Sequence, residues 1–432
     1  MEEDSTINLE ENFEKKIFNS KNIKLNRHHL LEENIINKIT NKIPDSINNK
    51  ITKIKFEIKK FNDKKKSKKV RNPGIDAIRL IGMFGIVISH VLHNRYKGAI
   101  IIFHKYSKNL EILHILSFWH INGFALISGI IGNKSNKYSN LLYLWMQVVF
   151  YSVGIFLYFK IFSRDSLIYT DISKEFFPII FKRYWYFTAY FGMYLYLPII
   201  NKGISILSHY EYRIFVISIL GIFVFWRSYK NPNIDVFCFR DGFSSFWLLT
   251  YYLIGAYIGK YRNIYFGFKN YIFCSFYLFI FLSISYLYFK ANNNQLHFTN
   301  SYLEKNLVTL IKKLLVNKYD SVLKIIQSIT ISLFLLQINY NAYISKIICF
   351  LGPLVFGIYL IHSNYLVEKN IISKVFENTP QEISLNSLII LILSKSLKIF
   401  IVCIIIDYLR YLLFFLLRIR KICSYLEIII KE

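Results

Sequence analysis

Cysteine is scarce in this sequence, with five residues in a chain of 432. None of the five lies in a paired spacing such as Cys-x-x-Cys, so the sequence indicates neither a disulfide framework nor a cysteine-ligated zinc site. We interpret these residues as apolar membrane cysteines, and we expect no metal site and no permanently bound cofactor. The five are Cys238, Cys274, Cys349, Cys403 and Cys423.

Acidic residues are also few: 27 Asp and Glu stand against 54 Lys and Arg, which gives a formal net charge of +27. A charge of this sign can indicate nucleic-acid binding. Here the basic residues are divided between an N-terminal segment and short stretches between apolar runs. Anionic membrane lipids are therefore the predicted partner, and we expect no nucleic acid.

No apolar signal-peptide region precedes the first long apolar run. Residues 1–71 are polar and rich in Lys, Asn and Glu, which predicts a largely disordered tail. Its last part, Lys50 to Arg71, holds eleven basic residues against two acids, which predicts a cytosolic N-terminus by the positive-inside rule. This cluster either serves only as a topology signal or also binds anionic lipid.

Apolar residues, in contrast, are abundant. Hydrophobic residues make up 54% of the chain and aromatics 18%, and apolar runs near 20 residues recur. This pattern predicts an all-α, polytopic membrane helix bundle of about ten transmembrane helices. We expect one transmembrane domain over 72–420 and a short C-terminal tail over 421–432. The predicted spans lie near 72–93, 113–131, 141–160, 184–201, 212–228, 244–260, 268–289, 321–338, 350–367 and 385–417.

An even number of spans returns the C-terminus to the side of the N-terminus. The basic residues that follow the last span, Arg418, Arg420 and Lys421, agree with a cytosolic C-terminus. We therefore expect a multi-pass integral membrane protein with both termini in the cytosol. A plasma membrane and an endomembrane fit the sequence equally.

The first apolar run, NPGIDAIRLIGMFGIVISHVLH over residues 72–93, carries unusual polar residues. On a helix, Asp76, Arg79, His90 and His93 fall within one stripe, and apolar side chains cover the other side. Arg79 and His90 are eleven residues apart, roughly 16 Å along the axis. Ionisable side chains in a membrane span usually face a bundle interior or a cavity, which makes this stripe a candidate functional site.

Five blocks follow one another over about residues 72 to 418. The first is Arg79 with a His eleven residues later, preceded by Asp in the context PGIDAIR. The later blocks are WHINGFALISGIIG (Trp119 to Gly132), RYWYFTAYFGMYLYLPIIN (Arg183 to Asn201), FWLLTYYLIGAYI (Phe246 to Ile258) and FGIYLIHSNYL (Phe356 to Leu366). In this order they resemble the membrane acyltransferase-3 family.

The resemblance implies an integral membrane O-acyltransferase, most simply an O-acetyltransferase. Its co-substrate would be a cytosolic acyl-CoA, such as acetyl-CoA, and its acceptor a hydroxyl of a carbohydrate or glycolipid. Many family members carry two arginines at the start of the third span. This chain has only Lys134 and Lys137 there, and lysine binds phosphate as a point charge rather than as a fork.

His90 is the predicted catalytic base, because an imidazole titrates near neutrality and can take a proton from an attacking hydroxyl. The alternative is a packing histidine that hydrogen-bonds across helices. Arg79 offers a permanently charged fork of donors for the phosphate or carbonyl oxygens of the donor. Asp76 either helps to bind the donor or simply pairs with Arg79 one turn away. About 21 Å along the axis separates Asp76 from His90, so any residue that orients His90 must come from another helix.

Five further residues are candidates for binding substrate or donor: His120, Trp185, Tyr186, Tyr359 and His362. The two histidines match family blocks and either face the same cavity or are core histidines with satisfied hydrogen bonds. The aromatic side chains of Trp185 and Tyr186 either stack on a sugar ring or belong to an interfacial belt. Tyr359 lies one turn before His362.

Two other polar features have structural interpretations. Ser128 lacks the Gly-x-Ser-x-Gly context of a nucleophile elbow, and close helix packing through neighbouring small residues explains this segment better. Those small residues are Gly123, Gly129 and Gly132. Asp407 and Arg410 lie one turn apart and are expected to pair.

Two other functions remain as alternatives. A transporter or flippase would use the polar stripe as a substrate path, although the sequence has no half-to-half repeat and no evident broken helices. A catalytically inactive relative would act as a membrane scaffold and bind a partner through its basic tail.

Overall fold

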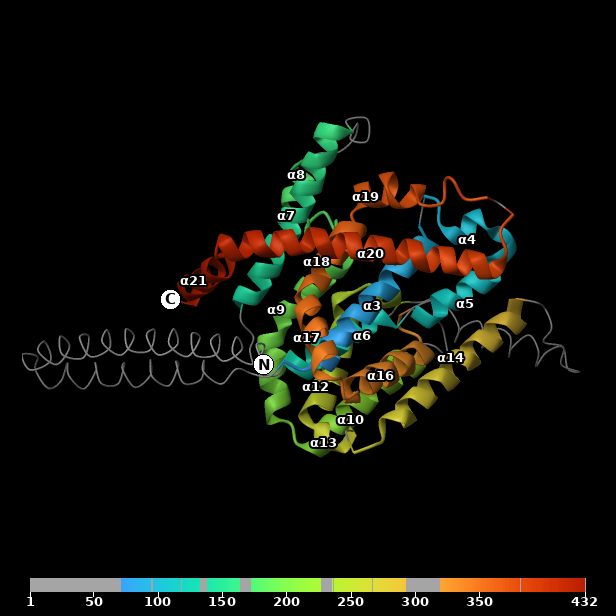
Figure 1. Cartoon of the computed structure of the whole chain (residues 1–432). Helices are drawn as coiled ribbons and strands as arrows, with labels where there is room; N and C mark the ends of the chain where they lie inside the picture. The colour runs from blue at the N-terminus through green and yellow to red at the C-terminus, as the bar shows by residue number, and fades with distance from the viewer. Residues whose placement is uncertain are drawn as a thin grey trace, which may run out of the picture. The chain divides into compact units, whose positions relative to one another are not determined.

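The computed structural model describes residues 71–94, 96–117, 119–132, 138–163, 172–226, 235, 237–265, 267–292, 319–380 and 382–431. The predicted N-terminal tail, apart from Arg71, and the two lysines Lys134 and Lys137 lie outside these residues. Regular structure in the described residues is entirely helical (Figure 1), which confirms the all-α class.

Helix α3 (Pro73–Leu92) is the central element. Asn72 caps it, because its side-chain oxygen accepts the Gly74 N–H at 2.9 Å, and Pro73 occupies the first turn, where its missing N–H costs nothing. The helix then runs unbroken to Leu92, so the polar stripe predicted on one helix is a single rigid element. Its packing partners are α5 (Ser107–Ser117), α6 (His120–Gly132), α16 (Val322–Gln337), α17 (Ala342–Leu351), α18 (Val355–His362) and α20 (Leu385–Leu416).

Helices α6 and α12 (Ser245–Lys260) approach each other through glycines. A Cβ on Gly255 would collide with the carbonyl of Leu126, and one on Gly129 would collide with the carbonyl of Tyr252. The Gly132 backbone lies against the Tyr252 ring, while Ser128 Oγ donates to Phe124 within its own helix. The predicted small-residue packing is thus confirmed at Gly129 and Gly132.

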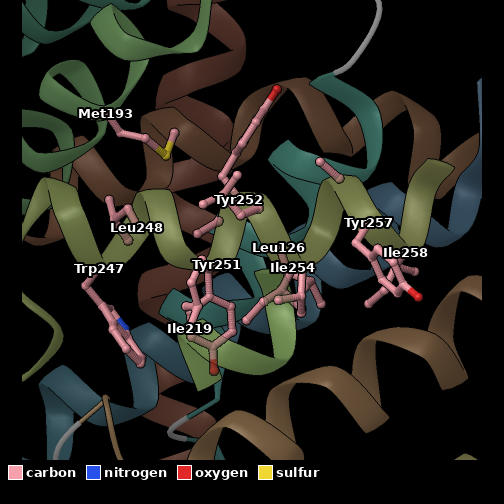
Figure 2. Close-up of a cluster of buried hydrophobic side chains, with 14 of the residues drawn as sticks. Leu126, Met193, Ile219, Trp247, Leu248, Tyr251, Tyr252, Ile254, Tyr257 and Ile258 are labelled. Carbon is pink, nitrogen blue, oxygen red and sulfur yellow. The ribbon is translucent and has the colours of Figure 1, made fainter. Parts of the chain in front are cut away.

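The surroundings of α12 form an aromatic core, part of which Figure 2 shows. Tyr251 and Tyr252 point to opposite sides of the helix in this view. The Tyr251 hydroxyl lies 3.0 Å from Ser328 Oγ, and the Tyr252 hydroxyl donates to Asn201 at 2.8 Å. The ring buries apolar area while the hydroxyl keeps a partner, so each tyrosine fixes α12 to a different neighbour.

Helix α20 buries one side and exposes the rest of its surface, although most of its residues are apolar. Its buried residues recur every three, four or seven positions, which places them on one stripe, whereas Ile390, Ile405 and Leu409 are largely exposed on the rest of the surface. A contiguous exposed apolar surface of this kind is typical of contact with a membrane. The buried residues are Leu388, Ile392, Ser396, Cys403, Asp407, Arg410 and Phe414.

The predicted pairing of Asp407 with Arg410 on this stripe is confirmed. The guanidinium donates twice to the carboxylate, from Nε at 2.9 Å and from Nη2 at 2.7 Å. Tyr151 donates to the same carboxylate at 2.8 Å, and Arg410 donates to the Tyr143 hydroxyl at 3.3 Å.

Five described segments are long and apolar enough to cross a membrane: Pro73–Leu92, His104–Gly132, Tyr138–Phe162, Ala342–His362 and Leu385–Leu416. The count of about ten spans therefore stays a prediction. Several of the other predicted spans are helices that are too short or too polar by this measure. For example, the 16 residues of α16 extend about 24 Å, which is less than a bilayer core of about 30 Å.

Two predicted spans are subdivided. The second consists of α5 and α6, which meet near Trp119, and the ninth consists of α17, a 3₁₀ turn η5 (Gly352–Leu354) and α18. The predicted C-terminal tail is a helix, α21 (Ile419–Lys431), which packs on α7 (Tyr138–Phe162) and contains Glu427, whose carboxylate accepts the Ser139 N–H at 3.2 Å. The remaining elements are α4 (Ala99–Ile102), η1 (His104–Tyr106), α8 (Ser173–Phe176), α9 (Trp185–Ile206), α10 (His209–Ile219), the π-helical η3 (Leu220–Trp226), η4 (Arg240–Gly242), α13 (Arg262–Tyr265), α14 (Asn270–Asn292), α19 (Tyr365–Asn370) and η6 (Ile372–Lys374).

Candidate active site

Two polar centres lie along the contact between α3 and the segment formed by η5 and α18. At the start of this segment, Gly352 packs directly against the Asp76 carboxylate of α3. At its end, the ring of His362 lies against the ring of His90. The two elements therefore run side by side in the same direction, and the predicted polar stripe of α3 faces α18 at both ends of their contact.

The first centre is the ion pair between Asp76 and Arg79. Arg79 Nη1 lies 2.8 Å from Asp76 Oδ1, so the pairing that the sequence offered as one alternative for Asp76 is present. The Asp76 side chain is 1% exposed and the Arg79 side chain 32% exposed. Among the described residues, the other guanidinium N–H groups have no hydrogen-bond acceptor, so most of the fork remains available to a ligand.

Aromatic residues lie between the two centres. Tyr359 on α18 accepts the Tyr186 backbone N–H at 3.3 Å, and the two rings are 6.2 Å apart. The charge of Arg79 acts on the hydroxyls of Tyr186 and of Tyr190, one turn further along α9. Tyr186 Oη is buried and has no hydrogen-bond partner among the described residues. Two of the predicted binding residues, Tyr186 and Tyr359, thus come together beside Arg79.

Trp185 lies beside this group. Its indole packs against Phe243 with the ring centroids 4.5 Å apart, and its ring centroid is 5.6 Å from that of Tyr186.

The second centre is a pair of imidazoles. The ring centroids of His90 and His362 are 4.9 Å apart, with their planes inclined by 51°. His362 is fully buried, and its Nδ1 donates to the Ile358 carbonyl at 2.6 Å. In the neutral ring this bond leaves the lone pair on Nε2, which has no hydrogen-bond partner among the described residues. A ligand hydroxyl at this point would therefore meet an oriented acceptor next to His90.

His120 lies on the neighbouring face of α3. Its Nε2 is 3.3 Å from Ser89 Oγ, which is itself 3.3 Å from Ser117 Oγ. Ser89 is adjacent to His90 in sequence, and consecutive residues on a helix point about 100° apart. His120 therefore contacts α3 through Ser89, and it also lies close enough to His90 for the two imidazoles to interact electrostatically.

The polar face of α5 is a feature that the predicted site did not include. Glu111 Oε1 lies 3.3 Å from His93 Nε2, and Glu111 Oε2 lies 3.6 Å from His114 Nδ1. Ser117 continues the same face and donates to the His114 carbonyl at 3.0 Å. The signal was present: Glu111, His114 and Ser117 recur at every third position, which aligns them on one side of a helix.

Comparison with known families matches residues 72–414 of this chain to the acyltransferase domain family Acyl_transf_3. Searches of curated proteins and of solved structures gave no significant match. The matched region begins at the residue that caps α3, contains both polar centres and ends within α20. The chain therefore belongs to the acyltransferase-3 family of membrane acyltransferases.

Proposed function

We propose that this protein is an O-acyltransferase that moves an acetyl group from cytosolic acetyl-CoA to a hydroxyl of a carbohydrate or glycolipid. The observation that carries the proposal is the contact between His90 and His362, where one imidazole has a fixed tautomer and an available Nε2. Acyl transfer to a hydroxyl needs a base next to the bound hydroxyl, because the proton must leave as the oxygen attacks. The available Nε2 of His362 can hold the acceptor, and the neighbouring imidazole of His90 can serve as that base.

In the proposed reaction, His90 accepts the proton of the acceptor hydroxyl while the hydroxyl oxygen attacks the thioester carbonyl. The carbon–sulfur bond then breaks, and the thiolate of CoA takes the proton from His90. The products are the acyl ester and free CoA, with His90 returned to its neutral form. His362 Nε2 accepts a hydrogen bond from a neighbouring hydroxyl of the acceptor. This contact holds the reacting hydroxyl beside His90, and positioning of this kind lowers the barrier to such a reaction.

Arg79 is the proposed donor-binding residue. CoA carries its phosphates at the far end of a long arm from the thioester, and Arg79 lies about 16 Å along α3 from His90, on nearly the same face. Asp76 fixes the guanidinium through one N–H and leaves the rest for phosphate oxygens. Tyr186 and Tyr359 lie between Arg79 and His90. His120 contacts the Ser89 hydroxyl, next to His90 in sequence. Trp185 is the proposed sugar-stacking residue at the edge of this group.

The orientation that suits this arrangement has both termini in the cytosol. The basic cluster of Lys50 to Arg71 and the basic residues near α21 support it. Arg79 is then the site residue nearer the cytosol, where acyl-CoA is available, and His90 lies deeper in the membrane.

The test is label transfer from radiolabelled acetyl-CoA in membranes that contain equal amounts of wild type, His90→Ala or His104→Ala. His104 is an exposed histidine outside the site and serves as a matched control. We expect label in a glycan or lipid fraction with wild type and with His104→Ala, and a loss of at least about 100-fold with His90→Ala. Equal labelling by His90→Ala would refute His90 as the base. Unmodified substrate that crosses vesicles would instead favour a transporter.

A further inference from the structure

The end of α3 and the face of α5 bring three potential metal ligands together outside the pair of imidazoles already described. His93 follows the last residue of α3, and Glu111 and His114 lie one turn apart on α5. One ligand atom from each residue lies within 4.8 Å of the other two. Two imidazoles and a carboxylate on two rigid elements form a donor set that zinc uses in proteins with an open fourth position.

The distances favour a shared ion over a direct ion pair. Strong contacts between a charged imidazole and a carboxylate are about 2.7–2.9 Å long. Those from Glu111 to His93 and to His114 are 3.3 Å and 3.6 Å. Zinc bonds to such ligands are about 2.0–2.2 Å long, so neighbouring ligands of one tetrahedral ion lie about 3.3–3.5 Å apart. Each carboxylate oxygen of Glu111 thus lies about as far from the ring nitrogen that it faces as two ligands of one tetrahedral ion lie from each other.

The cluster of His93, Glu111 and His114 is buried on one side and exposed to solvent on the other. The His114 side chain is 7% exposed and that of Glu111 is 14% exposed, whereas that of His93 is 38% exposed. Lys324 is a nearby cation whose charge acts on Glu111 and His114, and its amine donates to the Ile115 carbonyl and to Gln327, each at 3.3 Å. Glu111 supplies the negative charge that a divalent ion needs, and the exposed side at His93 leaves room for water.

We propose that His93, Glu111 and His114 bind a zinc ion whose fourth ligand is water. Imidazole ligands also suit copper and nickel, but zinc accepts this mixture of ligands without a demand for planar geometry. The ion would fasten α5 to the end of α3, only three residues beyond His90. The site therefore has a positioning role, and no step of acyl transfer passes through it.

The experiment uses the full chain, purified in detergent, treated with EDTA, incubated with zinc chloride and separated from free zinc by gel filtration. Elemental analysis is expected to give about one zinc per wild-type chain and per His104→Ala chain. Glu111→Gln and His114→Ala are expected to retain less than about one tenth of that amount, since loss of one of three ligands removes most of the affinity. Glu111→Gln keeps the shape of the side chain, so a failure to fold is a poor explanation for its loss of zinc.

A second readout is thermal unfolding of the same four proteins with and without zinc chloride. A ligand that binds only the folded state raises the midpoint temperature, so we expect an increase for wild type and His104→Ala and none for Glu111→Gln or His114→Ala. The inference is overturned if wild type retains no zinc, or if the two site variants retain as much zinc as wild type. Neither outcome depends on acyl transfer, so the zinc site and the proposed function fail independently.

Discussion

Two Asp–Arg pairs in this protein have the same spacing in sequence but different surroundings. In each, an aspartate pairs with an arginine three residues later on one helix, at 2.8 Å for Asp76 with Arg79 and at 2.7 Å for Asp407 with Arg410. The side chain of Arg410 is only 2% exposed, and its carboxylate partner also accepts a bond from Tyr151. Arg79 makes one bond to its aspartate and is 32% exposed.

Both aspartates contact the segment formed by η5 and α18. The carboxylate of Asp76 fills the space beside Gly352, and that of Asp407 fills the space beside Gly357. A Cβ at either glycine would collide with the carboxylate, so α18 and the preceding turn can lie between α3 and α20 only because both positions lack a side chain.

The difference shows how one local motif can have two roles. The pair on α20 is saturated by its neighbours, which is what a buried pair requires to offset its desolvation. The pair on α3 orients an arginine and leaves most of its donors available, which is what a binding site requires. The spacing of the two residues is the same in both, so the neighbouring helices decide the role.

The largest expected effect comes from removal of the Asp407 carboxylate. Asp407→Ala leaves the Arg410 guanidinium buried without its partner, and we expect a loss of about 3–5 kcal/mol in the free energy of unfolding. Asp76→Ala is expected to cost about 1–2 kcal/mol, because Arg79 can turn toward solvent. Reversible unfolding in mixed micelles measures both values. Equal losses would contradict the distinction between a saturated and an open pair.

Lysine substitutions at the two arginines are expected to have smaller effects, one on the binding of acyl-CoA and the other on stability. We expect Arg79→Lys to raise the KM for acyl-CoA about tenfold with little change in stability, because an ammonium cannot replace the fork. Arg410→Lys is expected to lower the free energy of unfolding by about 1–3 kcal/mol, since it loses a two-point contact, and to leave the KM of the folded protein unchanged.

Kinetics over a range of acyl-CoA concentrations and unfolding of the same preparations test the two lysine variants together. An unchanged KM in Arg79→Lys would argue against recognition of the donor by the guanidinium. A raised KM in folded Arg410→Lys would show that the pair on α20 also affects donor binding.

Local features of the site could be predicted from the sequence because helix geometry brings residues three apart together. Both Asp–Arg pairs, the unbroken α3 and the shared face of Arg79 and His90 follow from spacing alone. The contact between His90 and His362 joins residues far apart in sequence, so no local rule predicts it. The resemblance to the family indicated His362 only as a candidate.

The missed residues have a physical explanation as well. The apolar run of the second predicted span begins at Leu113, which leaves Glu111 in a polar loop, whereas α5 begins at Ser107. The difference between about ten predicted spans and the five segments that are long and apolar enough has a related cause. Hydropathy measures how apolar a helix is, but it does not measure whether the helix is long enough to cross a bilayer. The apolar helix α16 has only 16 residues, and it packs on α3, α6 and α14.

The smallest expected effect tests whether the pair on α20 is saturated by individual bonds. Tyr151→Phe removes one hydrogen bond to Asp407 and keeps the ring, so we expect a loss of about 1 kcal/mol in the free energy of unfolding. Tyr158→Phe on the same helix is the matched control, because Tyr158 is exposed, and its expected change is near zero. In the Arg410→Lys background the loss from Tyr151→Phe is expected to grow, because the carboxylate then depends more on its remaining donors. Strict additivity of the two losses would show instead that Tyr151 and Arg410 act on Asp407 independently.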